Sequence, residues 1–273
     1  MLKKSPAKWI FYGYIHAFFS LRNLVGSTTP IEIFGDIPAR PYLQWKIFRL
    51  LGLVPVKADT NTPSGKLSYS HTDATNHSPT PGINGRCSDI SKSRVEKVFA
   101  DVFGYSLAVD PLTYHGKIVR KSEVNAAHDG IVLQGPLTEA SPDFVYQVYV
   151  DASTQEGNWI DLRTCVVGKE LPFVYVKSRP LDLKFANHGN TIWDSQADQI
   201  FSAEELKLLL EFADAMGLDI GEMDVLRDNN SGKIYVVDIA KTPHSPSDNF
   251  ITLGGVLCMH KAAASFRRQF LPN

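Results

Sequence analysis

Two carboxylates lie in neighbouring apolar segments near the end of the chain. Asp224 follows Gly217-Leu-Asp-Ile-Gly-Glu-Met, and Asp238 follows Ile234-Tyr-Val-Val. The turn at 228–232 (Asp-Asn-Asn-Ser-Gly) predicts an antiparallel strand pair with the two aspartates at matching positions. The alternative is two ordinary strand-end aspartates. A charge within so apolar a segment is costly without a cation, and Mg²⁺ prefers carboxylate oxygens and shares them with phosphates. We therefore predict a metal bound by Asp224 and Asp238.

Lys121 is the first basic candidate. It follows the apolar segment 117–120 and precedes the loop 122–130, which contains His128 and a single glycine, Gly130. A lysine at a strand end beside a flexible loop can hold phosphate oxygens by its charge, with backbone N–H groups as further donors. A surface lysine ahead of a solvated loop has the same pattern, so this motif indicates phosphate binding only in combination with others.

Further charged candidates lie on the next two predicted strands. Asp161 and Arg163 are two residues apart, so they share one face of their strand, and Lys177 and Arg179 on the following strand point to the same region. Cations on a sheet can neutralise the charge on a transferring phosphate. A cross-strand salt bridge is the structural alternative. Three basic side chains over one sheet exceed what a single ion pair needs, which favours anion binding.

The helices and strands predicted to position these residues do not alternate regularly along the chain. The apolar spacing after Ser91 predicts a helix through Tyr105, and Ser202 followed by Glu205 predicts a helix start that leads to Met216. A last helix is expected over 262–270. The predicted strands cover 107–109, 117–120, 130–134, 144–150, 158–167, 173–178, 218–226 and 234–239. Strand pairs that alternate with single helices predict an α+β fold with antiparallel sheets rather than regular βαβ repeats.

The first 88 residues differ from the rest. The segment 60–86 is dense in Pro, Gly, Ser, Thr and Asn, which predicts a long loop after a helix-rich or mixed segment 1–59. Its histidines, His71 and His77, have no Cys or acidic partner at ligand spacing, so we expect solvated side chains rather than zinc ligands.

Three lysines precede an apolar stretch at 9–19 near the start of the sequence. This stretch is too short to span a bilayer, which needs about 20 residues. An amphipathic helix packed on the body or on a second subunit is expected. Membrane-surface contact is the alternative. Association into a homo-oligomer is left open.

Composition limits the classes of partner and compartment. The 273 residues carry a net charge of −1, so the chain has no overall basic field that indicates nucleic-acid binding. Three cysteines far apart in the sequence predict buried thiols in a reducing, cytoplasmic setting. The composition predicts no integral membrane span.

From about Asp89 to Pro243, the order of these features resembles the ATP-grasp superfamily, which includes glutathione synthetase and D-alanine–D-alanine ligase. The resemblance implies two α+β subdomains, 89–150 and 151–273, after a reduced N-terminal region 1–88. It implies that Lys121 contacts nucleotide phosphates, that the loop with His128 covers them, and that Arg163 and Lys121 are catalytic. It also implies nucleotide contacts from Asp161, Lys177, Arg179 and a hinge, Tyr146-Gln-Val-Tyr-Val150, whose backbone pairs with adenine at Gln147, Tyr149 and Val150.

The resemblance implies ATP and Mg²⁺ as cofactors, with Asp224 and Asp238 as magnesium ligands, and ligation of a small-molecule or peptide carboxylate to an amine. Two features depart from the family: Gln147 stands where Glu is frequent, and Ala240 where Asn is usual. Two alternatives are therefore kept. One is a kinase on the same scaffold, with Asp129, His128 or His188 as candidate base, and the other is a nucleotide-binding module with little activity.

Overall fold

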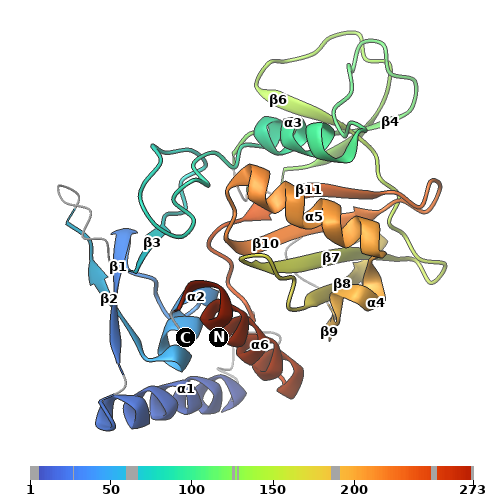
Figure 1. Ribbon diagram of the computed structural model, residues 1–273. Helices are drawn as coiled ribbons and strands as arrows, with labels where there is room; N and C mark the ends of the chain where they lie inside the picture. Colours follow the sequence, from blue (N-terminus) through green and yellow to red (C-terminus); the bar gives the residue numbers. More distant parts are fainter. Residues whose placement is uncertain are drawn as a thin grey trace.

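The computed structural model describes residues 6–26, 28–59, 67–124, 127, 129–185, 191–246 and 251–271. Within these residues the strands form three sheets (Figure 1). The helices are α1 (Pro6–Leu24), α2 (Leu43–Leu51), α3 (Lys92–Phe103), α4 (Ala197–Ile200), α5 (Ala203–Met216) and α6 (Leu253–Phe270), with a 3₁₀ turn at Leu181–Leu183. The strands are β1 (Thr29–Gly35), β2 (Leu53–Lys57), β3 (Ser68–His71), β4 (Lys117–Ser122), β5 (Ile131–Gln134), β6 (Phe144–Val148), β7 (Asn158–Val167), β8 (Val174–Pro180), β9 (Thr191–Ser195), β10 (Ile220–Arg227) and β11 (Ile234–Ala240).

The N-terminal region contains a parallel sheet, β2-β1-β3, that the sequence did not predict. Strand β3 lies inside the predicted loop. Its residues pair with β1, and Ser70 N–H donates to the carbonyl of Ile83 at 2.8 Å. The predicted loop is therefore partly a strand, because the neighbouring backbone supplies hydrogen-bond partners that local composition does not reveal.

Helix α1 packs on the body, as the sequence predicted. Phe11, Tyr12 and Ile15 are buried with Trp45 of α2 and Met259 of α6. None of the described helices is long and apolar enough to cross a bilayer.

A second sheet, β5-β4-β6, is antiparallel and is accompanied by α3 (Figure 1). The predicted helix start is confirmed, since Ser91 Oγ accepts from Arg94 N–H at 3.4 Å, and Gly104 ends the helix in the left-handed conformation. The predicted strand 107–109 is wrong: Ala108 forms only an isolated bridge with Gln147. Three residues without a continuous ladder do not make a strand.

The third sheet, β11-β10-β7-β8-β9, is antiparallel throughout and carries most of the candidate residues. The predicted hairpin of β7 and β8 and the pair β10–β11 are both confirmed. Helices α3 and α5 cover one face, where Phe99 and Phe212 join one hydrophobic core with Met223 and Val225 of β10. This packing leaves the opposite face to form the site.

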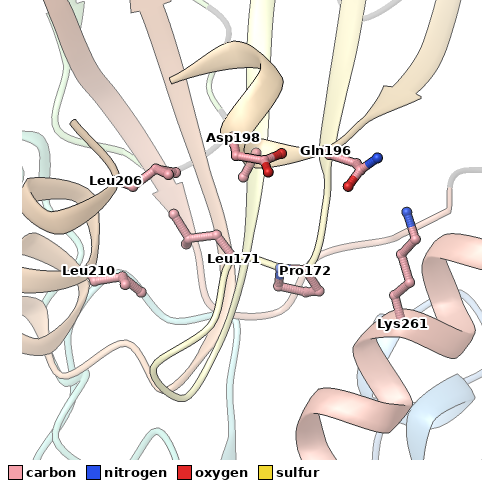
Figure 2. Close-up of a pocket in the computed structure, with 8 residues that line it drawn as sticks. Leu171, Pro172, Gln196, Asp198, Leu206, Leu210 and Lys261 are labelled. Carbon is pink, nitrogen blue, oxygen red and sulfur yellow. The ribbon is translucent and has the colours of Figure 1, made fainter. Parts of the chain in front are cut away.

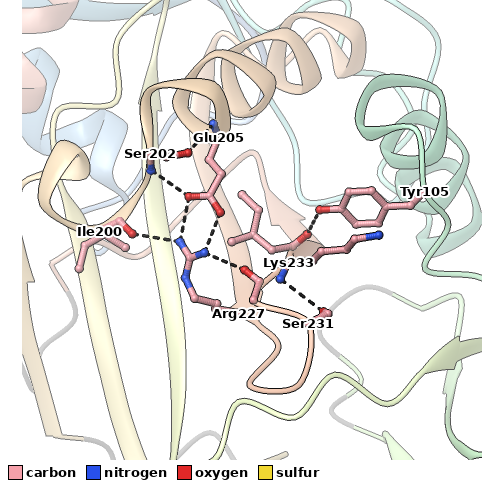
Figure 3. A network of polar contacts seen from close by, with 9 residues as sticks. Tyr105, Ile200, Ser202, Glu205, Arg227, Ser231 and Lys233 are labelled. Atoms are coloured by element: carbon pink, nitrogen blue, oxygen red, sulfur yellow. Dashed lines mark hydrogen bonds and ion pairs between the residues drawn. The ribbon is translucent and has the colours of Figure 1, made fainter.

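The start of α5 is joined to the end of β10 by a polar network (Figure 3). Ser202 and Glu205 form the predicted capping box, in which each side chain accepts from the other residue's backbone N–H. Glu205 also receives two hydrogen bonds from Arg227, at 2.7 and 2.9 Å, and Arg227 donates to the carbonyl of Ile200. The network holds the far end of the strand that carries Asp224.

The opposite face of the third sheet changes from apolar to charged along its strands. Cys165 and Phe173 are fully buried under α6 together with Phe266. Helix α6 begins at Leu253, nine residues before the predicted start at 262, and so covers more of this face than expected. Beyond the helix, the same strand positions carry charged residues, because side chains two residues apart lie on one face.

The N-terminal region is fixed to β10 and to the segment after β11 by buried polar contacts. Asn84 exchanges hydrogen bonds with the backbone of Ile220, at 2.6 and 2.7 Å. Lys46 Nζ donates to the carbonyls of Ser245 and Pro246. Because a polar group that is buried without a partner is costly, these hydrogen bonds compensate the Asn84 amide and the Lys46 ammonium for their lost contacts with water.

His71 lies at the same junction, and the sequence-based prediction of a solvated His71 is wrong. Its side chain is 3% exposed and contacts the Tyr42 ring. Burial lowers the pKa of His71 to about 4. The tertiary contact with the N-terminal sheet, not the polar composition of the loop, determines its environment.

Glu96 of α3 supports a prediction on stability. Its carboxylate accepts from the Gln147 side chain at 2.8 Å, and burial raises its pKa to about 7 from 4.5. A raised folded-state pKa contributes stability below pH 4.5 that is lost as the pH rises through about 7. We expect Glu96→Gln to unfold with a free energy about 3 kcal/mol above wild type at pH 8, and equal to it at pH 4.5.

Denaturant titrations at the two pH values measure this difference, with surface Glu211→Gln as the control. A gain of the same size at both pH values would contradict the assignment.

Candidate functional site

A cleft of about 160 Å³ lies where the second and third sheets approach each other. Seven of the predicted site residues line it together: Lys121, Asp161, Arg163, Lys177, Arg179, Asp224 and Asp238. They come from β4, β7, β8, β10 and β11. The residues that the sequence predicted from separate motifs therefore share one site.

Arg163 forms the strongest ion pair of the cleft. Its Nε and Nη2 donate to the two carboxylate oxygens of Asp224 at 2.6 and 2.7 Å, and Nε lies 3.6 Å from Glu222 Oε2. Burial alone would raise the pKa of Asp224, but the Arg163 guanidinium holds it well below its usual range. A bidentate, charge-assisted pair of this kind fixes the guanidinium plane.

Asp238 lies directly opposite Asp224 in the β10–β11 register, as predicted. Burial, and then the charge of Asp224, raise the pKa of Asp238, while Lys92 and Lys121 act in the opposite sense. Ile239 N–H donates to its carboxylate at 3.0 Å. Asp238 is thus a buried carboxylate whose ionised form an added cation would stabilise.

The carboxylates of the cleft are potential ligands for Mg²⁺, which prefers oxygen donors. Among the described residues, no group of three or more His, Cys, Asp or Glu side chains has metal-binding geometry. Two carboxylates nevertheless fit a magnesium ion that takes its other ligands from phosphates and water. Asp238 fits this role without rearrangement, whereas Asp224 would share its oxygens between the metal and Arg163.

The outer part of the cleft holds a second ion pair. Asp161 pairs with Arg179 and also accepts from Trp159 Nε1 at 2.9 Å. Burial lowers the pKa of Arg179, and burial and the neighbouring Arg163 charge lower the pKa of Lys177. The predicted alternative of a cross-strand salt bridge thus holds for Asp161 and Arg179. Lys177 lies directly opposite Asp161 in the register of β7 and β8.

The predicted adenine contacts do not line the cleft through their side chains. Gln147 is 1% exposed and is hydrogen-bonded to Glu96. Val150 is part of the hydrophobic core, and the Tyr149 ring lies beneath the Lys117 and Lys184 ammonium groups. Contacts from this hinge would therefore involve backbone groups. His128 lies outside the described residues.

Lys92 and Glu222 also belong to the site, and neither was predicted from the sequence. Lys92, the first residue of α3, lines the cleft and donates to the carbonyl of Val124 at 2.9 Å. Glu222 is 2% exposed beside Arg163. The period of two along β10 places Glu222 on the face of Asp224, so strand alternation could have identified it. Lys92 depends on the long-range approach of α3, for which the sequence has no local signal.

A second cavity, of about 360 Å³ and of mixed polar and apolar lining, lies at the opposite end of the third sheet. Figure 2 shows Leu171, Pro172, Leu206 and Leu210 grouped on one side, with Lys261 pointing toward Gln196. None of the predicted site residues lines it. The charged cleft, although smaller, is therefore the candidate active site.

Neither a protein-family model nor a curated protein matches this chain. Among solved structures, a RiPP-associated ATP-grasp ligase from Chryseobacterium gregarium, in complex with ADP and a leader and core peptide, aligns over 88% of this chain and 97% of its own, at 11% identity and a TM-score of 0.50. The chain has the ATP-grasp fold.

Two further ATP-grasp structures are similar. A RimK domain protein from Sphaerobacter thermophilus aligns over 89% of this chain and all of its own, at 11% identity and a TM-score of 0.49. The ATP-grasp ligase PsnB, complexed with a minimal precursor, aligns over 67% of this chain at 18% identity and a TM-score of 0.48. The chain spans 64% of the length of that PsnB chain.

Within this ATP-grasp fold, Ala240 lies opposite Glu222 in the register of β10 and β11. The side chain where the superfamily usually has Asn thus offers no oxygen ligand. Glu222 is the nearest carboxylate in the register, but it faces Arg163 at 3.6 Å. Among the described residues, no group of three or more potential metal ligands includes a side chain that would replace the missing Asn at position 240.

Proposed function

We propose that this protein is an ATP- and Mg²⁺-dependent carboxylate–amine ligase. The observation that carries the proposal is the composition of the cleft, where Lys92, Lys121, Arg163 and Lys177 gather around Asp224 and Asp238. With Arg179 and Lys184, six cations line the cleft beside four carboxylates, an excess of positive charge that suits a nucleotide triphosphate whose charge a magnesium ion shares. Similarity to ligases of known structure supports the same class.

In this proposal each group has a defined role. Lys92 and Lys121 hold phosphate oxygens by charge, and Asp238, with Asp224, holds the magnesium ion. The backbone of 147–150 adjoins adenine, and the outer residues Asp161, Lys177 and Arg179 shape the nucleotide cleft. When bound, Mg²⁺ supplies positive charge at the phosphate oxygens.

The proposed reaction has two steps. A substrate carboxylate oxygen bonds to the γ-phosphorus while the bond to ADP breaks, which gives an acyl phosphate. An amine then bonds to the acyl carbon, phosphate leaves, and the amine loses a proton. Arg163 stabilises the charge on the transferring group, and the remaining residues align the reactants.

The substrate is proposed to be a small molecule or peptide with a carboxylate. One similar ligase was solved with a leader and core peptide, which supports a peptide for this chain as well. We propose 89–150 and 151–273 as the two grasp subdomains, with 1–88 as the preceding region. Because ATP is the phosphoryl donor, the proposed location is the cytoplasm.

A catalytically weak nucleotide-binding module is the second candidate. It is favoured by Ala240, which removes one expected ligand, and by the Arg163–Asp224 pair, which occupies another. Amide product with ADP and phosphate would indicate the ligase, phosphorylated product with ADP a kinase, and binding without turnover this module.

Lys121→Met tests the nucleotide site without a large change in volume. We expect calorimetric titration with Mg²⁺ and a non-hydrolysable ATP analogue to show binding by wild type and about tenfold weaker binding by the variant, since a charge-assisted hydrogen bond contributes about 1.5–3 kcal/mol. Lys97→Met, which removes an exposed lysine from the far side of α3, should bind as wild type. Absence of binding by the wild-type protein would refute the proposal.

A further inference from the structure

Helix α1 carries an exposed face that is entirely uncharged. Phe11, Tyr12 and Ile15 face the body. With 3.6 residues per turn, the opposite half of the helix is formed by residues that are all exposed: Trp9, Ile10, Gly13, Ala17, Ser20, Leu21 and Leu24. Ile10 is 73% exposed and Leu24 is 82% exposed. A continuous apolar surface of this kind marks an interaction site rather than scattered surface residues.

The region around this helix is strongly basic, although the whole chain is not. Residues 1–57 contain eight Lys and Arg and two Asp and Glu, a formal charge of +6 in a chain of net charge −1. Neither α1 nor α2 contains an acidic residue. The positive charge of the protein is therefore concentrated beside its most exposed apolar helix.

Cationic side chains lie beside α1 as well. The Arg49 guanidinium lies 4.1 Å from the Phe19 ring centroid, and the exposed Arg40 precedes α2, whose Trp45 ring contacts His16 of α1. The Arg22 guanidinium, on the helix itself, lies 5.5 Å from the Phe18 ring centroid. No ion pair within the described part of the chain includes Arg22, Arg40 or Arg49.

We propose that α1 docks the protein onto an anionic lipid surface. Trp, Ile and Leu enter the boundary between headgroups and acyl chains, and the flanking arginines contact anionic headgroups. A second copy of the chain is a poorer occupant, because it would bring two regions of charge +6 together. A nucleic acid would use the cations but not the uncharged face.

The position of α1 is compatible with an active site in solution. Figure 1 shows α1 at the bottom of the molecule, beneath α2 and β1, with α3 and the second sheet at the top and the third sheet to the right, above α6. A lipid surface beneath α1 would leave the charged cleft uncovered. The inference does not depend on the proposed ligase activity, because docking is measured without nucleotide.

Co-sedimentation of the full chain with lipid vesicles tests the proposal. We expect binding to mixed phosphatidylcholine–phosphatidylglycerol vesicles, much weaker binding to phosphatidylcholine alone, and a decrease as salt is raised. Ile10→Ser and Leu24→Ser should each weaken the partition about tenfold, and Arg40→Gln about fivefold. Leu112→Ser, an equally apolar exposed change outside the N-terminal region, should have no effect.

Three outcomes would overturn the proposal. The first is no binding to either vesicle, and the second is binding that Leu112→Ser weakens as much as Ile10→Ser does. The third is a concentration-dependent dimer that Leu24→Ser abolishes, without vesicle binding, which would assign the face to a second copy. Because all four substituted side chains are at the surface, thermal unfolding of each variant should match wild type.

Discussion

Asp238→Asn is expected to abolish magnesium-dependent nucleotide binding. Asp238 is the buried carboxylate that lacks an arginine partner, and burial and Asp224 already raise its pKa. The amide keeps the shape and the hydrogen bond from Ile239 N–H but removes the charge that would hold the metal. We expect an affinity for Mg²⁺–ADP at least one hundredfold lower, about 3 kcal/mol, measured by calorimetric titration.

The free energy of unfolding of Asp238→Asn shows whether the variant loses nucleotide binding because it loses the metal ligand or because it unfolds. Since the amide of the Asp238→Asn variant does not ionise, no second charge is buried beside Asp224, and the variant should be as stable as wild type or more so at pH 7. Asp101→Asn, which removes an exposed carboxylate paired with Lys97, serves as the matched control and should bind normally. Unchanged magnesium dependence in the Asp238→Asn variant would exclude this residue as the main ligand.

Arg163→Met is expected to lower both stability and turnover. The substitution leaves the buried Glu222 and the partly exposed Asp224 without their cation, which costs about 3 kcal/mol at neutral pH. Arg163→Lys keeps the charge but not the bidentate geometry, so a smaller loss of about 1–2 kcal/mol is expected. Chemical denaturation measures the stability. A loss of turnover of about one hundredfold would match the removal of a transition-state donor.

The pH dependence of this loss identifies its cause. Because Arg163 holds the pKa of Asp224 below its usual range, the pair contributes stability that is present above pH 3.8 and is lost as the pH falls toward the lowered folded-state pKa. The difference between wild type and Arg163→Met should therefore be largest at pH 7 and should decrease progressively once the pH falls below 3.8, toward the lowered folded-state pKa of Asp224. A second change, Asp224→Asn, should restore part of the stability of Arg163→Met. A pH-independent loss would instead indicate a packing defect.

Much of the third sheet and its helix was determined by local sequence. The apolar runs and the short turn predicted β7, β8 and the β10–β11 pair, and hence the opposition of Asp224 and Asp238. Ser202, Glu205 and Gly217 marked the ends of α5, because caps act over a few residues. Strand alternation also placed Asp161 and Arg163 on the cleft side.

Only the tertiary structure decided which charged groups pair. Arg163 could have paired with Asp161 or Asp224, and the approach of β10 selected Asp224. The Gln147 side chain pairs with Glu96 of α3, and Lys92, the first residue of the same helix, lines the cleft. Strand patterns and turns depend on residues close together in the sequence, so the sequence could predict which residues belong to the site. Desolvation and ion pairing depend on neighbours that are far apart in the sequence, so only the fold determined the contacts of those residues.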